Sequence, residues 1–194
     1  MSTTTEREYN LRLDKACDIS GYASTDTSRF VITHVHLRED FLEATDGRMM
    51  VRIPYPPTAT DETVDRKGLD AMVPALTVKK ALRDAGKAGV VDAHVNGAVS
   101  LIVPGGVTHK AEKVDGQYPQ TDKVWPGKEP TFSITLAAEL LAKLAEHAAK
   151  HGKRNGTCTG IRFDFTADCE AVRFSYALGP DRQATGVLMP MRMA

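Results

Sequence analysis

The sequence predicts an α+β fold built from a repeated unit of one strand, one helix and three further strands. Short runs of alternating apolar residues, separated by turn residues, are typical of antiparallel strands with one face in a core. Two longer segments carry apolar residues at helical spacing instead. The order of these segments recurs at about 60 residues, which favours a modular architecture. An apolar content of 42% and a charged content of 26% in 194 residues are ordinary for a folded domain.

The first cycle begins with a strand and has a weak helix. Alternating Tyr9, Leu11 and Leu13 predict a strand over 8–13, and a short helical turn is expected over 14–19. Asp46–Gly47 is a hairpin signal between two later strands. Residues 54–68 contain three prolines and form a candidate linker to the next cycle. The three strands expected after the helical turn cover residues 30–37, 41–45 and 48–53.

The second cycle contains a clear amphipathic helix over 77–88. Its apolar residues Val78, Ala81, Leu82 and Ala85 follow the spacing i, i+3, i+4, i+7 and therefore share one face. The other expected elements are a strand over 71–73 before the helix and strands over 90–95, 99–103 and 107–113 after it, with turns at 96–97 and 104–106.

The third cycle repeats this order. A strand is expected over 131–135 and a helix over 136–151, followed by strands over 160–165, 171–178 and 186–193. The apolar face of this helix comprises Leu136, Leu140, Leu141, Leu144 and Ala148. The chain is therefore predicted to have two parts: 1–127, with two cycles of which the first has a degraded helix, and 128–194, with a single cycle.

The charge pattern bears on nucleic-acid binding. Lys plus Arg and Asp plus Glu each number 25, so a polyanionic partner requires clustered charge rather than net charge. Basic residues do cluster away from the apolar face of both helices. Such a stripe is typical of a helix that contacts phosphates without reading bases, although solvated basic faces are also common on helices. The candidate DNA-binding residues are Lys79, Lys80, Arg83, Lys87, Lys143, His147, Lys150, Lys153 and Arg154.

Other kinds of site are weakly indicated. His34 and His36 share a strand face and could bind a metal, but no third ligand is evident, so a structural role is favoured. Gly105–Gly106 precedes a strand rather than a helix, which disfavours a phosphate-binding loop. For Asp164 and Asp168 a turn role is favoured. Because no catalytic constellation is recognisable, we expect no enzymatic activity, no cofactor and no metal.

The sequence also predicts a cytoplasmic protein. Residues 1–7 are polar and lack the core of a signal peptide, and no apolar run approaches the ~20 residues of a membrane helix. Cys17, Cys158 and Cys169 are odd in number and form no CxxC pair, which is typical of reduced thiols, mostly in a core.

Three motifs resemble segments of the bacterial DNA polymerase III beta sliding clamp family, and they occur in the family's order. Residues 44–50, ATDGRMM, resemble the A-T-D-G-H-R-L segment of the family's middle domain. Residues 114–126, VDGQYPQTDKVWP, resemble V-D-G-R-F-P-D-Y-R-R-V-L-P. Residues 187–193, VLMPMRM, resemble the terminal V-V-M-P-M-R-L. On these segments the chain is identified as a shortened or divergent member.

The resemblance implies a DNA-clamp (processivity factor) fold, with antiparallel sheets outside and helices inside that face double-stranded DNA without sequence preference. It further implies a homo-oligomeric ring and a hydrophobic groove for peptides of DNA polymerase and clamp loader. A methionine-rich groove suits several peptides, since methionine is flexible and polarisable, although plain core packing is the alternative. The groove residues carried over are Thr45, Gly47, Arg48, Met49, Met50, Pro119, Lys123, Val124, Val187, Leu188, Met189, Pro190, Met191 and Arg192.

The chain departs from the family in length. A family subunit has three domains of two cycles each, whereas this sequence has about three cycles: one full middle domain (1–127) and a part like the C-terminal half of the last domain (128–194). By analogy, four such chains would supply the twelve cycles of a family ring. The alternative is a clamp-like adaptor that binds replication-protein peptides without forming a ring. An enzyme that uses this fold as a scaffold has no supporting residues.

Overall fold

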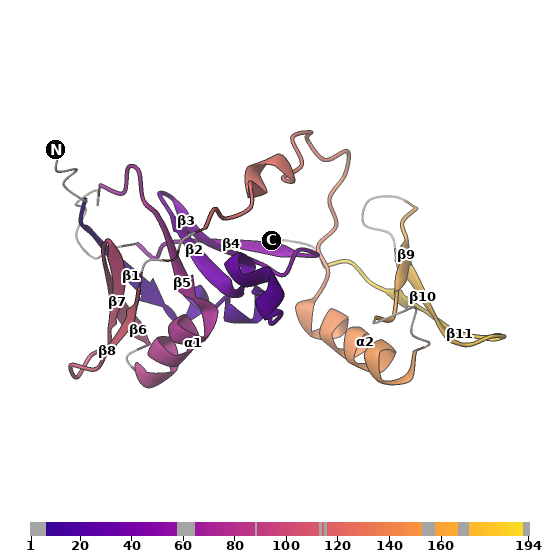
Figure 1. Cartoon of the computed structure of the whole chain (residues 1–194). Coiled ribbons are helices and arrows are strands. Elements are labelled where there is room, and N and C mark those ends of the chain that lie inside the picture. Colours follow the sequence, from indigo (N-terminus) through magenta and orange to yellow (C-terminus); the bar gives the residue numbers. More distant parts are fainter. Residues whose placement is uncertain are drawn as a thin grey trace. The chain divides into compact units, whose positions relative to one another are not determined.

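The chain forms two compact units (Figure 1). A computed structural model describes residues 7–57, 65–87, 89–112, 114, 116–152, 158–166 and 171–191. Unit 1 is Met1–Val124 and unit 2 is Trp125–Ala194. Within the described ranges, no helix is long and apolar enough to cross a membrane.

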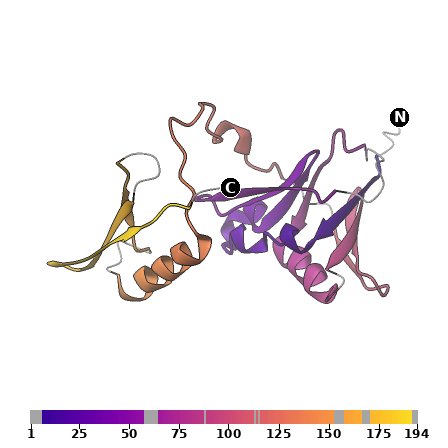
Figure 2. The same ribbon diagram turned by 180° about the vertical axis from the view of Figure 1, so that it is seen from behind.

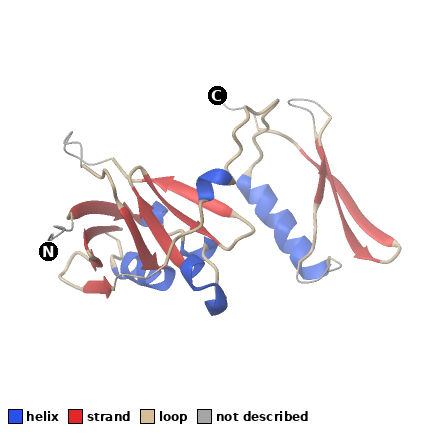
Figure 3. Ribbon diagram, turned by 45° about the horizontal axis from the view of Figure 1, so that its top comes forward, coloured by secondary structure: helices blue, strands red, loops and turns tan. Residues whose placement is uncertain are grey.

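Unit 1 contains two antiparallel four-stranded sheets (Figure 3). In one sheet the strand order is β1-β6-β7-β8, and in the other it is β4-β3-β2-β5. The strands of the first sheet are β1 (Tyr9–Asp14), β6 (Val90–Asn96), β7 (Ala98–Ile102) and β8 (Thr108–Ala111). Those of the second are β2 (His34–Arg38), β3 (Phe41–Thr45), β4 (Met50–Pro54) and β5 (Asp70–Pro74).

The two cycles of unit 1 exchange their first strands. β1 begins the first cycle but pairs with β6 of the second, with Leu11 opposite Ala93. β5 begins the second cycle but pairs with β2 of the first, with Val35 opposite Val73. All four of these residues are buried. Because each sheet needs a strand from the other cycle, the two cycles form one cooperative core.

Helix α1 (Ala75–Asp84) follows β5 directly and packs its apolar face onto this core. Val78, Ala81 and Leu82 are buried, as their spacing predicts. The helix is shorter than the expected 77–88 and is shifted toward the N-terminus. Residues 85–87 form a turn in which Gly86 has a φ of +55°, a conformation that ends a helix.

Short 3-10 turns take the place of a helix in the first cycle: η1 (Lys15–Cys17), η2 (Ser20–Tyr22) and η3 (Thr27–Thr33). The side chain of Asp14 begins η1 by accepting the N–H groups of Ala16 and Cys17. Because η3 runs to Thr33, β2 starts at His34, and the expected strand start at residue 30 is wrong.

In unit 2, helix α2 (Ala138–His151) packs on one face of a three-stranded sheet of order β11-β10-β9 (Figure 2). Leu144 and Ala148 of the helix are buried against Val172, Tyr176 and Leu188 of the sheet. The strands are β9 (Arg162–Asp164), β10 (Val172–Gly179) and β11 (Arg182–Leu188).

Three predictions for unit 2 are wrong. Residues 131–135 form no strand, because they have no neighbouring strand to pair with in the described chain. The last strand covers 182–188 instead of 186–193, because β10 and β11 form a tight hairpin that starts at Arg182. Leu140 is 42% exposed, since Leu144 and Ala148 already fill the contact between helix and sheet.

Candidate functional site

The outward face of α1 is basic. Its core-facing residues are spaced so that the polar residues emerge together on the opposite side. Asp84, the acidic residue of this helix, lies within 3.1 Å of His109 of β8 and 3.4 Å of Arg83, so it offsets part of the charge. The exposed basic residues are Lys79, Lys80 and Arg83 on the helix and Lys87 in the turn that follows it.

On α2 the predicted basic residues differ in their surroundings. Lys143 and Lys150 are exposed. His147 is exposed as well, but it shares a hydrogen bond with the Tyr176 hydroxyl, and its ring lies 4.6 Å from that of His151. This contact fixes the ring against β10 and leaves it less available to a phosphate. Lys153 and Arg154 lie outside the described residues.

The hairpin between β3 and β4 explains the residue types of the first motif. Thr45 Oγ1 accepts the Gly47 N–H and donates to the Met49 carbonyl, while Asp46 accepts the N–H groups of Arg48 and Met49. These backbone hydrogen bonds lower the pKa of Asp46. Thr45 and Asp46 therefore hold the turn, whereas Arg48 and Met49 project into solvent.

Gly47 is required by the same turn. Its φ is +86°, and a Cβ at this position would collide with the guanidinium of Arg29, which donates to the Asp46 carbonyl at 3.1 Å. Met50, the first residue of β4, is half-buried.

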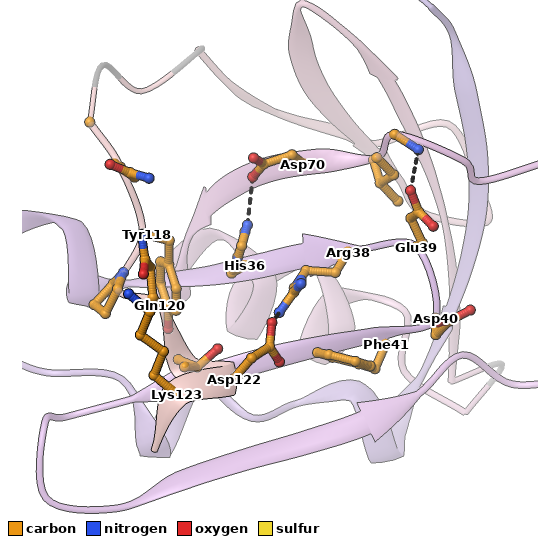
Figure 4. A pocket seen from close by; sticks show the side chains of 16 residues that line it. His36, Arg38, Glu39, Asp40, Phe41, Asp70, Tyr118, Gln120, Asp122 and Lys123 are labelled. Atoms are coloured by element: carbon orange, nitrogen blue, oxygen red, sulfur yellow. Dashed lines mark hydrogen bonds and ion pairs between the residues drawn. The ribbon is translucent and has the colours of Figure 1, made fainter. Parts of the chain in front are cut away.

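The segment 116–124, which contains the predicted groove residues Pro119, Lys123 and Val124, lies across the outer face of the β4-β3-β2-β5 sheet (Figure 4). Tyr118 is buried, with its ring 4.4 Å from that of His36. Thr121 is also buried and opens the short turn η4 (Thr121–Lys123). These contacts leave the predicted groove residues Pro119, Lys123 and Val124 exposed to solvent.

Beneath this segment, Glu43 is the centre of a buried polar network. It accepts hydrogen bonds from Thr121 at 2.8 Å and from Arg52 Nε at 2.9 Å, and His36 Nδ1 lies 3.0 Å from its carboxylate. Asp122 extends the network by accepting from Arg52 at 2.6 Å and from Arg38 at 2.8 Å. The network ties three adjacent strands to the segment above them.

The electrostatics of Glu43 follow from this geometry. Burial alone would raise its pKa, but hydrogen bonds from His36, Thr121 and Arg52 outweigh burial, so the pKa lies below its ordinary value of 4.5. The pKa of Asp122 is likewise lowered, mainly by its hydrogen bond to Arg38. Both carboxylates are therefore ionised at neutral pH and hold the two arginines in place.

A polar cavity of about 680 Å³ lies beside the network, between β2 and residues 116–123 (Figure 4). His36 points into it and contacts Asp70 at 2.6 Å through Nε2. With both ring nitrogens against carboxylates, His36 is held as a structural residue. The ring of His34 contacts the Phe30 carbonyl instead. The residues that the structure describes contain no group of three side chains that could hold a metal ion.

The predicted groove residues 187–192 belong to the C-terminal tail of unit 2. β11 ends at Leu188, which is buried in the unit 2 core. Val187, Met189 and Met191 are 60%, 63% and 52% exposed, and Pro190 is half-buried. Their exposure disfavours core packing as the role of the methionines. The Met191 N–H donates to the Thr135 carbonyl at 2.8 Å and fixes the tail. Arg192 lies outside the described residues.

Gly105 and Gly106 form the turn between β7 and β8, each with positive φ, which accounts for both glycines without a phosphate. Cys17 is buried, and burial raises its pKa to about 12. Cys158 is exposed, and Cys169 lies outside the described residues.

No protein-family model and no curated protein matches this chain. Solved structures do match it. The DNA polymerase III subunit beta of Borrelia burgdorferi has a TM-score of 0.72 at 15% identity and covers 97% of this chain and 50% of its own. The sliding clamp of Bacillus subtilis has a TM-score of 0.71 at 15% identity, and the match covers 98% of this chain and 51% of that clamp. The beta sliding clamp of C. crescentus has a TM-score of 0.69 at 18% identity, and the match covers 98% of this chain and 52% of that clamp.

These similarities establish the fold. The chain has the fold of the bacterial sliding clamps, with antiparallel sheets and few helices, and it spans about half the length of the clamps that it matches. The fold predicted from the sequence is thereby confirmed.

Proposed function

We propose that this chain is a compact sliding clamp, a non-catalytic processivity factor that encircles duplex DNA and tethers a polymerase. The observation that carries the proposal is the basic outward face of α1, where Lys79, Lys80 and Arg83 are exposed on a fold shared with sliding clamps. Lysine and arginine on a helix surface suit phosphates of any sequence. The role places the chain in the cytoplasm, with the DNA being copied.

The mechanism is topological. A closed ring cannot leave a duplex sideways, so its inner surface needs only weak, mobile contacts with phosphates. The balanced net charge of the chain is compatible with this mechanism, because retention does not depend on overall affinity. Exposed apolar side chains, Met49 in unit 1 and Val187, Met189 and Met191 in unit 2, are the candidates to receive the hydrophobic peptide of a polymerase or loader.

The topological mechanism predicts retention that depends on DNA ends. We expect the assembled chain to stay on nicked circular duplex through gel filtration at physiological salt and to be lost within minutes after a single cut linearises the circle. The measurement is the fraction of labelled chain that co-elutes with DNA before and after cutting. Equal retention on circular and linear DNA would exclude encirclement.

The basic face of α1 carries a second prediction. Lys80→Ala combined with Arg83→Ala should make the slope of log K against log salt for duplex binding shallower by about 2, because each lost phosphate contact removes about 0.9. Binding is measured by fluorescence anisotropy between 50 and roughly 200 mM salt.

The matched control is Lys67→Ala with Lys128→Ala, two exposed lysines that lie in loops rather than on a helix. The control pair should leave the slope unchanged. An unchanged slope in the α1 variant, or the same change in both, would place the DNA contact elsewhere.

A clamp-like adaptor is the second candidate. It is favoured by the length of the chain, about half that of the clamps it matches, and by the zero net charge. An adaptor would bind the same hydrophobic peptides but would remain a monomer in solution. Native mass measurement together with the circle experiment separates the two functions, because an adaptor predicts neither assembly nor dependence on DNA ends.

A further inference from the structure

Unit 2 contains a single cycle, whereas the sheets of unit 1 are each completed by the other cycle. In unit 1, β2 and β6 are the first of the three strands of their cycles. Each of them pairs on its outer side with the exchanged first strand, β5 or β1. β9 has the same position in unit 2. In the described part of the chain it pairs with β10 alone, through Arg162, Phe163 and Asp164.

The segment that precedes α2 has the composition of a first strand. Residues 131–135, Thr-Phe-Ser-Ile-Thr, are β-branched or aromatic except for the serine, and they enter α2 as β5 enters α1. Phe132 is 47% exposed, whereas Ile134 packs partly on the unit 2 core. Among the described residues, the segment 131–135 makes one backbone hydrogen bond to another segment, in which the Met191 N–H donates to the Thr135 carbonyl.

We propose that two copies of this chain exchange these segments, so that residues 131–135 of each copy pair antiparallel with β9 of the other. The product is one complete two-cycle domain with a two-fold axis, built as unit 1 is built from its two cycles. A second copy is the expected partner, because one isologous contact pairs the outer edge of β9 in each copy with the 131–135 segment of the other. Exposed edge strands favour this kind of pairing.

The inference goes beyond the proposed function because it rests on strand topology alone and would hold even for a chain that never encircles DNA.

Ser133→Pro tests the exchange in the full-length chain. Proline cannot donate to a strand ladder, so the substitution should weaken self-association by about tenfold or more. Ser133 is exposed and makes none of the hydrogen bonds described above, so the fold of each copy should be kept. Sedimentation equilibrium gives the association constant, and circular dichroism and thermal melting check the fold. Lys128→Pro, in the exposed loop before the segment, is the control and should associate like the parent.

Hydrogen exchange supplies a direct readout. In the associated parent, the amides of 131–135 and of Arg162–Asp164 should be protected together, and this protection should fall on dilution and in Ser133→Pro. A parent that stays monomeric, assembles only in odd numbers, or keeps its mass in Ser133→Pro would overturn the proposal. A parent that pairs as described but shows no preference for circular DNA would retain this inference and reject the clamp function.

Discussion

Glu43→Ala is expected to lower the free energy of unfolding by about 3 kcal/mol. Glu43 is fully buried and receives hydrogen bonds from Thr121 and Arg52. Alanine removes these contacts and leaves the Thr121 hydroxyl and the ring of His36 without the carboxylate that they face. Arg52 keeps its contact with Asp122, which limits the loss. Urea denaturation followed by circular dichroism measures the change.

The effect should depend on pH. A carboxyl group with a lowered folded-state pKa contributes stability above its unfolded pKa, here about 4.5, and loses that contribution as pH falls through the folded-state pKa. The difference between parent and Glu43→Ala should therefore be largest at neutral pH and should shrink below about pH 4.5. A difference that stays constant down to pH 3 would show that charge at Glu43 does not hold the network.

The control for Glu43→Ala is Arg12→Ala, which removes an exposed ion pair with Asp92 of 3.9 Å. Exposed pairs contribute at most about 1 kcal/mol, so this variant should unfold almost like the parent. Glu43→Ala should in addition raise protease cleavage within 116–124, because Thr121 loses its buried contact. An equal loss of stability in both variants would contradict the central position of Glu43.

The polar network shows where sequence reasoning was insufficient. The alternation in β3 places Leu42 and Ala44 in the core and thus assigns Glu43 to the opposite face, where solvent is the ordinary neighbour. That face is covered by a segment that lies about 78 residues further along the chain, as the contact between Glu43 and Thr121 shows. The sequence feature that could have indicated the network is the pairing across strands, because Glu43 lies opposite both His36 and Arg52.

The elements that could be predicted from the sequence are those that depend on residues close together in the chain. The helical spacing of Val78, Ala81 and Leu82 and the Asp46–Gly47 turn are set by neighbours in sequence, and both agree with the structure. The strand expected over 131–135 failed because a strand needs a partner, and composition alone supplies none. The basic and groove residues were located from pattern and resemblance. The structure gives the exposure of those that it describes, whereas their contacts with DNA and peptide remain predictions.

Met191→Ala is expected to weaken binding of a hydrophobic polymerase-derived peptide by about tenfold, since a buried anchor at an interface contributes 1–2 kcal/mol or more. Met191 is 52% exposed in the unit 2 tail, and its backbone N–H, rather than its side chain, binds Thr135. Alanine therefore removes an adaptable apolar surface without releasing the tail. Fluorescence anisotropy with a labelled peptide gives the dissociation constant, and the melting temperature should change little.

Val107→Ala is the matched control, because Val107 is also 52% exposed but lies beside the β7–β8 turn of unit 1. Met49→Ala, in the hairpin of unit 1, tests the exposed methionine of that unit in the same way. Loss of affinity in Met191→Ala alone would confine the peptide to unit 2. A peptide that binds all three variants with the affinity of the parent would show that the exposed methionines serve another surface.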